Sequence, residues 1–414
     1  MNTGYSIPTV DISNETERQF TVDREKGQYL GHPTTVLLDD NKTIVCVYPK
    51  CHGCGKITLK KSYDGGITWS DRLPVPASFS TSLEVPTIFK TYDKNGKRRL
   101  LIFSSFFPIR MSVSEDDGET WSELSPIGPY GGVTSMGEML SLGDGEYMAF
   151  FHDDGTYFTP TGAEHRIELW VTGEGEAART QVLHFYSKDD GETWSEPQDN
   201  FIVAETREGD NWRCLYRSVP RATGPLSHTV YSVISKDGGL TWSRNPKKIA
   251  HVDGLALCEP AAVFSPDKKQ IAVVMREDTH KHSSYIITSD DMGETWSEPR
   301  ELPSVLMGDR HCIRYLNDGR LFISFRDKCI GSPSQGSWAG WVGTYDDLVN
   351  GREGQYRVFI MKNSRGSDCG YPGIVVLPDD TVVATSYGHF TDGEPAYVMT
   401  VRFKPEELDK KLML

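Results

Sequence analysis

The stretch Ser62-Tyr63-Asp64-Gly65-Gly66-Ile67-Thr68-Trp69 contains a pattern, Ser-x-Asp-x-Gly-x-Thr-Trp, that recurs along this chain of 414 residues. Four further copies begin at Ser114, Ser187, Ser235 and Ser289. A self-repeat with a period of roughly 50 residues is typical of propellers and solenoids. The repeat therefore indicates the architecture of the whole chain rather than one local element.

Each copy has the composition of a tight turn between two strands. A β-rich run such as residues 285–288 precedes the turn, Asp and Gly form it, and Trp opens the next extended segment. The Asp carboxylate can accept hydrogen bonds from the backbone of the turn, Gly permits a positive φ, and Trp can cover the turn. The motif predicts a stapled hairpin and no chemistry.

With five such turns the sequence resembles the Asp-box family, whose best-known members are the sialidases (neuraminidases). The resemblance implies an all-β fold, a six-bladed β-propeller of sialidase type. Two boxes, at Ser187 and Ser235, precede the next clear opening strand, so we expect an extra hairpin within blade three, with a seventh blade as the alternative. We expect residues 1–28 to form an arm along the outside of the propeller and residues 29–414 to form a single propeller domain.

Composition limits the partners of the chain. A formal net charge of −14 argues against nucleic acid and against an anionic membrane surface. The sequence contains neither a signal peptide nor an apolar run of membrane-spanning length, so we expect a soluble protein, cytoplasmic or exported with its signal removed. Its eight cysteines form no disulfide framework, and we expect reduced thiols. Cys51-His52-Gly53-Cys54 lacks a second closely spaced pair to complete four zinc ligands, so neither a metal nor a cofactor is predicted.

Polar residues should gather at the centre of the predicted propeller. The innermost strand of each blade starts on one face, and the second strand returns to that face. This rule selects the starts of first strands, at His32, Glu84, Glu138, Glu259, Arg310, His311 and Tyr371. It also selects the ends of second strands, at Lys50, His52, His152, Asp153, Arg276, Arg326, Asp327, Tyr387 and His389. Charged residues in a shared concavity must be paired, solvated or used, so we predict a functional funnel whose members contact a substrate.

Three of these residues match the sialidase pattern in blade and in order: Glu259, Arg276 and Tyr371. By this resemblance Tyr371 is the nucleophile, Glu259 is its base, and Arg276 is one clamp on a substrate carboxylate. A 2-keto sugar acid carries a carboxylate at its anomeric carbon, which would repel a carboxylate nucleophile, and sialidases use Tyr instead. A phenol has a pKa near 10 and needs the neighbouring Glu to take its proton.

The sequence also departs from the sialidase pattern. Gly31-His32-Pro33 stands where sialidases have Arg-Ile-Pro, segment 50–53 has no acid/base Asp, and segment 337–341 has no clamp Arg. Arg310 and Arg326 could rebuild a carboxylate site, and His52 or His32 could donate the proton. The resemblance implies an exo-glycosidase that removes a terminal acidic sugar, sialic acid or a related 2-keto sugar acid, from a glycan.

Two other classes of function fit the same scaffold. A polysaccharide lyase, or a differently wired glycosidase, could use the His, Tyr and Arg residues of the funnel to abstract a proton beside a uronate carboxyl. A carbohydrate-binding propeller without turnover would explain the missing acid/base Asp. The fold alone cannot choose among these functions.

Overall fold

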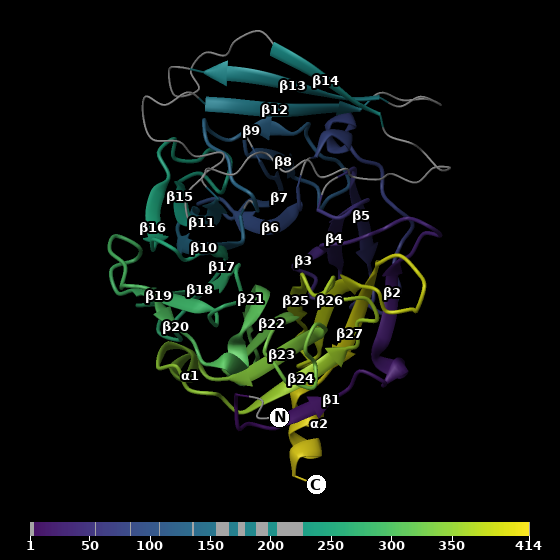
Figure 1. Cartoon of the computed structure of the whole chain (residues 1–414), viewed down its shortest axis with the longest axis vertical. Helices are drawn as coiled ribbons and strands as arrows, with labels where there is room; N and C mark the ends of the chain where they lie inside the picture. Colours follow the sequence, from purple (N-terminus) through teal and green to yellow (C-terminus); the bar gives the residue numbers. More distant parts are fainter. Residues whose placement is uncertain are drawn as a thin grey trace.

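A computed structural model describes residues 4–53, 55–82, 84–106, 108–134, 136–154, 165–172, 179–187, 198–204 and 227–413. Within these ranges the chain is almost entirely β, and six antiparallel sheets follow one another around a ring (Figure 1). The prediction of a six-bladed β-propeller is therefore confirmed.

The first three blades account for the N-terminal half of the ring. Blade one contains β3 (Thr34–Leu37), β4 (Ile44–Pro49) and β5 (Ile57–Ser62). Blade two contains β6 (Thr87–Tyr92), β7 (Arg98–Ser104), β8 (Arg110–Ser114) and β9 (Ser125–Pro126). Blade three contains β10 (Glu138–Gly143), β11 (Glu146–Asp153), β15 (Thr229–Ser235) and β16 (Lys247–His251).

The last three blades complete the ring. Blade four contains β17 (Leu257–Phe264), β18 (Ile271–Glu277), β19 (Tyr285–Ser289) and β20 (Arg300–Glu301). Blade five contains β21 (Gly308–Tyr315), β22 (Leu321–Asp327), β23 (Trp338–Gly343) and β24 (Tyr356–Met361). Blade six contains β25 (Gly373–Val376), β26 (Val382–Gly388) and β27 (Tyr397–Phe403). Neither described α-helix, α1 (Tyr345–Val349) or α2 (Pro405–Leu412), is long and apolar enough to cross a membrane.

The expected insertion in blade three is a separate sheet of three strands. It contains β12 (His165–Thr172), β13 (Arg179–Ser187) and β14 (Gln198–Ala204), which lie in the chain between β11 and β15. Figure 1 shows this sheet at the top of the molecule, beyond the ring. The box that begins at Ser187 starts at the end of β13, and its remaining residues lie outside the described ranges.

The N-terminal segment adds strands to the edges of two blades. β1 (Thr9–Asp11) pairs in parallel with β24, and β2 (Gln19–Asp23) pairs antiparallel with β27. Blade six therefore combines a strand from the start of the chain with strands from its end, and Figure 1 shows the two termini close together. Pairing of the two ends closes the ring.

The four described box turns, residues 62–69, 114–121, 235–242 and 289–296, follow the third strand of their blades, away from the innermost strand. In the first turn the Thr68 amide and hydroxyl donate to the Asp64 carboxylate at 2.9 and 2.6 Å, and the Gly66 amide donates to Ser62 Oγ at 2.7 Å. Gly66 has a φ of 90°, and a Cβ there would lie 2.7 Å from Val383 Cγ1 of blade six. Each box thus staples its own hairpin, and the first packs tightly against the preceding blade.

The hydrophobic cores lie between neighbouring blades. One cluster joins β17 and β18 of blade four to β22 and β23 of blade five and includes Val274, Ile323 and Trp341, all completely buried. Because this apolar packing takes place between blades, the residues where the inner strands open are left for polar groups.

Candidate active site

The backbone at the openings of three inner strands is held in a strained conformation. His32, Glu259 and Arg310 have φ values of 56°, 49° and 51°, in the left-handed region that L-residues rarely adopt. Pairing with the second strand shifts register between Cys258 and Ala261 in β17, and β21 shows the same irregularity. Such bulges re-aim side chains, and here the Glu259 carboxylate reaches the backbone amide of Arg310 in β21.

Tyr371 and Glu259 form a hydrogen-bonded pair, called here the Tyr–Glu pair. The Tyr371 hydroxyl donates to Glu259 Oε1, and Arg276 Nη1 lies 3.1 Å from that same oxygen and 3.2 Å from Tyr371 Oη. The Arg310 amide donates to Glu259 Oε2 at 2.9 Å. Gly370, with a φ of 80°, permits the approach of Tyr371, because a Cβ there would lie 2.9 Å from the Arg326 backbone. The three residues matched to the sialidase pattern are therefore in contact.

The charges around the Tyr–Glu pair keep the proton on the phenol and the carboxylate ionised. Burial opposes ionisation of Glu259, but Arg276 and the Tyr371 hydroxyl outweigh it and lower the pKa of Glu259. Burial and the negative charge of Glu259 raise the pKa of Tyr371 well above its usual value. The resting pair is thus a neutral phenol donating to a carboxylate, which is the arrangement a general base needs.

Two of the predicted clamp arginines already hold a carboxylate of the protein. Asp309 is completely buried, and its carboxylate lies 2.9 Å from Arg276 Nε and 3.3 Å from Arg326 Nη1. His280 Nε2 approaches the same carboxylate to 2.6 Å. Burial opposes the ionisation of Asp309, but Arg276, the hydrogen bond with His280 and Arg326 outweigh it and hold the pKa of its carboxyl far below the usual range. The sequence rule selected Arg310 and His311 and missed their neighbour Asp309.

Arg310 has a different environment. Its residue is only 4% exposed, its Nη1 is buried without a hydrogen-bond partner, and no described carboxylate lies within ion-pair distance of it. Burial is the main cause that lowers the pKa of His32 and of His152, and the charge of Arg310 adds a smaller contribution in the same direction. A buried cation with no carboxylate within ion-pair distance among the described residues is a candidate to bind an anion of a ligand.

Asp368 gathers a second polar group, here called the Asp368 cluster, that the sequence rule did not select. Its carboxylate accepts from Tyr29 Oη at 2.9 Å and from Tyr387 Oη at 3.0 Å. His52 Nε2 lies 3.4 Å away, and His389 Nε2 lies 3.3 Å away. Burial opposes ionisation of Asp368, but hydrogen bonds from His52 and Tyr29 help to lower its pKa far below the usual range. The only sequence signal was its position, three residues before Tyr371.

The two histidines predicted as proton donors differ in their surroundings. His32 is buried, accepts a hydrogen bond from the Gly53 amide on Nδ1, and places Nε2 3.1 Å from Tyr387 Oη. Burial lowers the pKa of His32 well below its usual value, so its imidazole is neutral. The His52 side chain is 44% exposed and faces Asp368. Solvent access and a carboxylate partner favour His52 over His32 as an acid.

The remaining predicted residues lie at the strand openings with separate partners. Burial raises the pKa of Glu84 to about 7. Glu138 is held by Arg314 Nη1 at 2.6 Å, and His311 places Nε2 2.9 Å from the Leu306 carbonyl oxygen. Tyr387 and His389 belong to the Asp368 cluster. His152 accepts a long hydrogen bond, 3.3 Å, from the Glu259 amide, and its neighbour Asp153 is buried.

Comparison with known proteins places the chain in a family and agrees with its fold. The model of the family described as a BNR repeat-like domain matches residues 163–384, more than half of the chain. The chain belongs to the BNR repeat-like family. With its six-bladed ring and its likeness to a sialidase, this family member falls within the sialidase superfamily.

Individual relatives of this BNR repeat-like chain are distant. A sialidase of Paraclostridium sordellii is 22% identical over 377 residues, covering 78% of this chain and 88% of that protein. A crystal structure of a Dyadobacter fermentans protein of unknown function superposes with a TM-score of 0.57 at 14% identity, covering 93% of this chain and 97% of the other. The NanB sialidase of Streptococcus pneumoniae gives a TM-score of 0.46 at 14% identity, covering 94% and 71%. At these identities the structural likeness concerns the fold alone.

Proposed function

We propose that this protein is a retaining exo-glycosidase of sialidase type that acts on a terminal acidic sugar of a glycan. The observation that carries the proposal is the hydrogen bond from Tyr371 to Glu259, with Arg276 beside both oxygens. A phenol directed at a buried, ionised carboxylate is the arrangement expected of a tyrosine nucleophile and its base.

In the first step the Tyr371 oxygen attacks the anomeric carbon while the phenolic proton passes to Glu259. His52 gives its proton to the departing glycosidic oxygen, so charge does not accumulate on the leaving group. In the second step a water oxygen attacks the anomeric carbon, the bond from this carbon to the Tyr371 oxygen breaks, and the water gives a proton to His52. Glu259 then returns its proton to the released phenolate, which restores the resting state. Asp368 is a positioning residue here, because its carboxylate lies 3.4 Å from His52 Nε2 and orients that ring.

Arg310 is the residue from which we infer that the substrate is acidic. Its guanidinium is the buried cation at this centre for which the described residues provide no carboxylate, and a substrate carboxylate would supply the missing partner. Arg276 and Arg326, which share Asp309, would add to the positive field without both contacting the ligand directly.

One observation favours a second candidate, a glycosidase of the same mechanism acting on a neutral sugar. Asp309 occupies two of the arginines that a substrate carboxylate would otherwise use. A neutral sugar needs no such clamp, and its hydroxyl groups could instead bind buried carboxylates such as Glu84.

A panel of chromogenic glycosides, acidic and neutral, tests the proposal with wild type, Tyr371→Phe and the control Tyr315→Phe. Tyr315 donates one hydrogen bond to the Phe264 carbonyl oxygen at 2.7 Å and takes no part in the Tyr–Glu pair. We expect wild type and Tyr315→Phe to release the chromophore from acidic glycosides, and Tyr371→Phe to lose on the order of 10³-fold or more in kcat.

Four results would contradict the proposal in distinguishable ways. Turnover of neutral glycosides alone would support the second candidate. A product with an unsaturated ring absorbing in the near ultraviolet would identify a lyase. Binding of sugars without any product would identify a carbohydrate-binding propeller. Substantial activity in Tyr371→Phe would exclude the tyrosine mechanism for any glycoside.

A further inference from the structure

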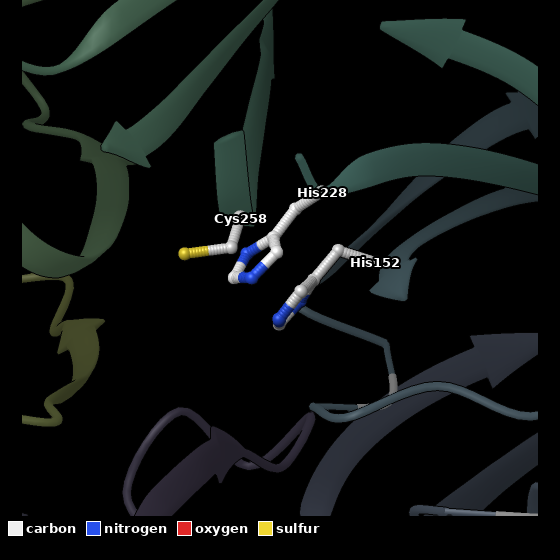
Figure 2. A group of neighbouring side chains, drawn as sticks. All are labelled: His152, His228 and Cys258. Carbon is white, nitrogen blue, oxygen red and sulfur yellow. The ribbon is translucent and has the colours of Figure 1, made fainter. Parts of the chain in front are cut away.

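Three buried side chains with metal-binding atoms meet beside the Tyr–Glu pair, and none of them has a role in the proposed reaction. His152 lies near the end of β11, His228 directly precedes β15, and Cys258 lies in β17 (Figure 2). Their residues are 3%, 5% and 2% exposed. One ligand atom from each lies within 4.8 Å of the other two. The fold therefore brings together three residues that span 106 positions of the chain, from 152 to 258.

The chemistry of this trio is that of a soft, borderline metal site. Two imidazoles and one thiolate are the ligands that zinc and its neighbours in the periodic table prefer over calcium or magnesium. The two imidazole rings stack with centroids 5.8 Å apart, next to the Cys258 side chain (Figure 2). Tetrahedral zinc needs ligand atoms roughly 3.3 to 3.7 Å apart, so an ion would draw the trio together by about 1 Å.

The trio is coupled to Glu259 through the backbone. Cys258 is the preceding residue, and the Glu259 amide donates to His152 Nδ1 at 3.3 Å. An ion at Nδ1 would displace this long hydrogen bond. An ion at Nε2 would put the ring proton on Nδ1, which could then no longer accept from the amide. In either case an ion on this ring alters how the bulge that carries Glu259 is held.

We propose that His152, His228 and Cys258 form a binding site for one zinc-type divalent ion. The ion takes two neutral imidazole nitrogens and the Cys258 sulfur, whose proton is released to solvent, and it keeps a fourth position open. This site differs from the segment Cys51-His52-Gly53-Cys54, of which Cys54 lies outside the described residues.

The test uses full-length protein with any affinity tag removed, stripped with chelator, incubated with zinc sulfate or cobalt chloride and then desalted. Cys258→Ser and His228→Gln remove one ligand each. The control Cys312→Ser removes another thiol, one that lies in β21 outside the trio. The measurements are metal per chain by mass spectrometry and the thiolate-to-cobalt absorption band.

We expect roughly one zinc ion per chain in wild type and Cys312→Ser, and a cobalt–thiolate band in both. We expect at least about a 100-fold loss of zinc affinity, and no band, in Cys258→Ser. His228→Gln should keep the thiol and still lose affinity. The cobalt spectrum of wild type requires no variant, so it tests the proposed site even if a variant fails to fold. Absence of metal and of the band in wild type, or equal binding by Cys258→Ser, would overturn the proposal.

Discussion

The box turns lie on the outer strands of their blades, whereas Glu259, Arg310 and Tyr371 lie where inner strands open. Asp64 accepts four hydrogen bonds, all from residues within its own eight-residue turn. Glu259 instead takes its partners from Tyr371, 112 positions away, and from the Arg310 amide, 51 positions away. We call the box turns the rim and the openings of the inner strands the centre. Polar groups of the rim find hydrogen-bond partners within their own turn, whereas those of the centre find partners only once the ring is assembled.

The two regions therefore differ in how their polar groups affect the stability of the fold. A box carboxylate satisfies a turn at little cost because its environment is exposed. At the centre, buried charges and left-handed backbone are retained at a cost in stability, as is common where a protein binds or reacts. Substitutions should therefore separate the two regions, with effects on activity at the centre and effects on stability alone at the rim.

Among substitutions that compare the two regions, the largest effect on activity is expected at His52. If it protonates the leaving oxygen, His52→Ala should lower kcat/KM by about 10² to 10⁴-fold for a substrate with a poor leaving group. A substrate that releases an acidic phenol needs no such proton and should be nearly unaffected. The control is His282→Ala, an exposed histidine of blade four. An equal loss for both substrates would remove His52 from the mechanism.

Arginines inside and outside the centre provide the next comparison. Arg310→Ala should cost roughly 2 to 5 kcal/mol of transition-state binding for an acidic glycoside, because no other described cation replaces its unpaired charge. Arg276→Ala and Arg326→Ala should each cost a similar amount and also destabilise the fold, because each leaves Asp309 buried with fewer cations.

Arg320 is the matched control for these arginines outside the centre. It pairs with Asp409 at 2.8 Å and lies at the turn between β21 and β22, at the end of β22 opposite to Arg326. Arg320→Ala should lower stability and leave kcat/KM unchanged. Unchanged turnover of an acidic glycoside by Arg310→Ala would contradict the assigned role of this residue.

Glu84 is a carboxyl group buried at the centre. The pH dependence of folding stability measures how much this burial costs. Burial raises its pKa to about 7, with Glu259 adding to the shift and His52 opposing it. The folded protein therefore keeps a proton that the unfolded chain releases, and stability falls as pH rises from about 4.5 to about 7. One pKa unit is worth 1.36 kcal/mol, so the loss is up to about 3 kcal/mol.

The variant Glu84→Gln should remove this loss. It should be more stable than wild type at pH 8 and similar to it near pH 4.5, as measured by urea unfolding across that range. Glu298→Gln, at an exposed position of blade four, is the control and should follow wild type. An unchanged pH slope in Glu84→Gln would show that the carboxyl is not buried as described.

The smallest effect is expected at the rim itself. Asp64→Ala removes the acceptor of the turn's hydrogen bonds and should lower the free energy of unfolding by about 1 to 3 kcal/mol. The kcat/KM of the folded enzyme should remain within experimental error. Asp71→Ala, an exposed Asp just beyond the same turn, should change neither quantity. A large loss of activity at unchanged stability would contradict the statement that substitutions at the rim affect stability alone.

The sequence alone was sufficient to predict the ring because the box pattern is local. Ser62, Asp64 and Thr68 contact one another within a few positions, so their spacing in the chain is also their spacing in the structure. The rule based on strand starts and ends also selected Glu259, Arg276 and Tyr371, because a propeller repeats the same connection in every blade. The structure shows these three side chains in contact.

The rest of the centre could not be predicted in the same way. Asp309 is the second residue of β21, one position before the strand start that the rule selected, and Asp368 lies before β25. The bulge of β21 and the segment before β25 bring these two carboxylates inward. The sequence rule could not tell that Asp309 holds two arginines, because ion pairing depends on side-chain directions that a one-residue bulge reverses. For the same reason it could not separate buried His32 from exposed His52.

The most direct test of the account is to trap the covalent intermediate with a fluorinated acidic sugar that forms it quickly and hydrolyses it slowly. Wild type is incubated with this compound, digested with protease, and the peptides are sequenced by mass spectrometry. The account predicts one label per chain, on the peptide that contains Tyr371 and on the Tyr371 oxygen, and none in Tyr371→Phe. A label on Glu259 or on any other carboxylate, or inhibition by the compound without any label, would contradict the central claim.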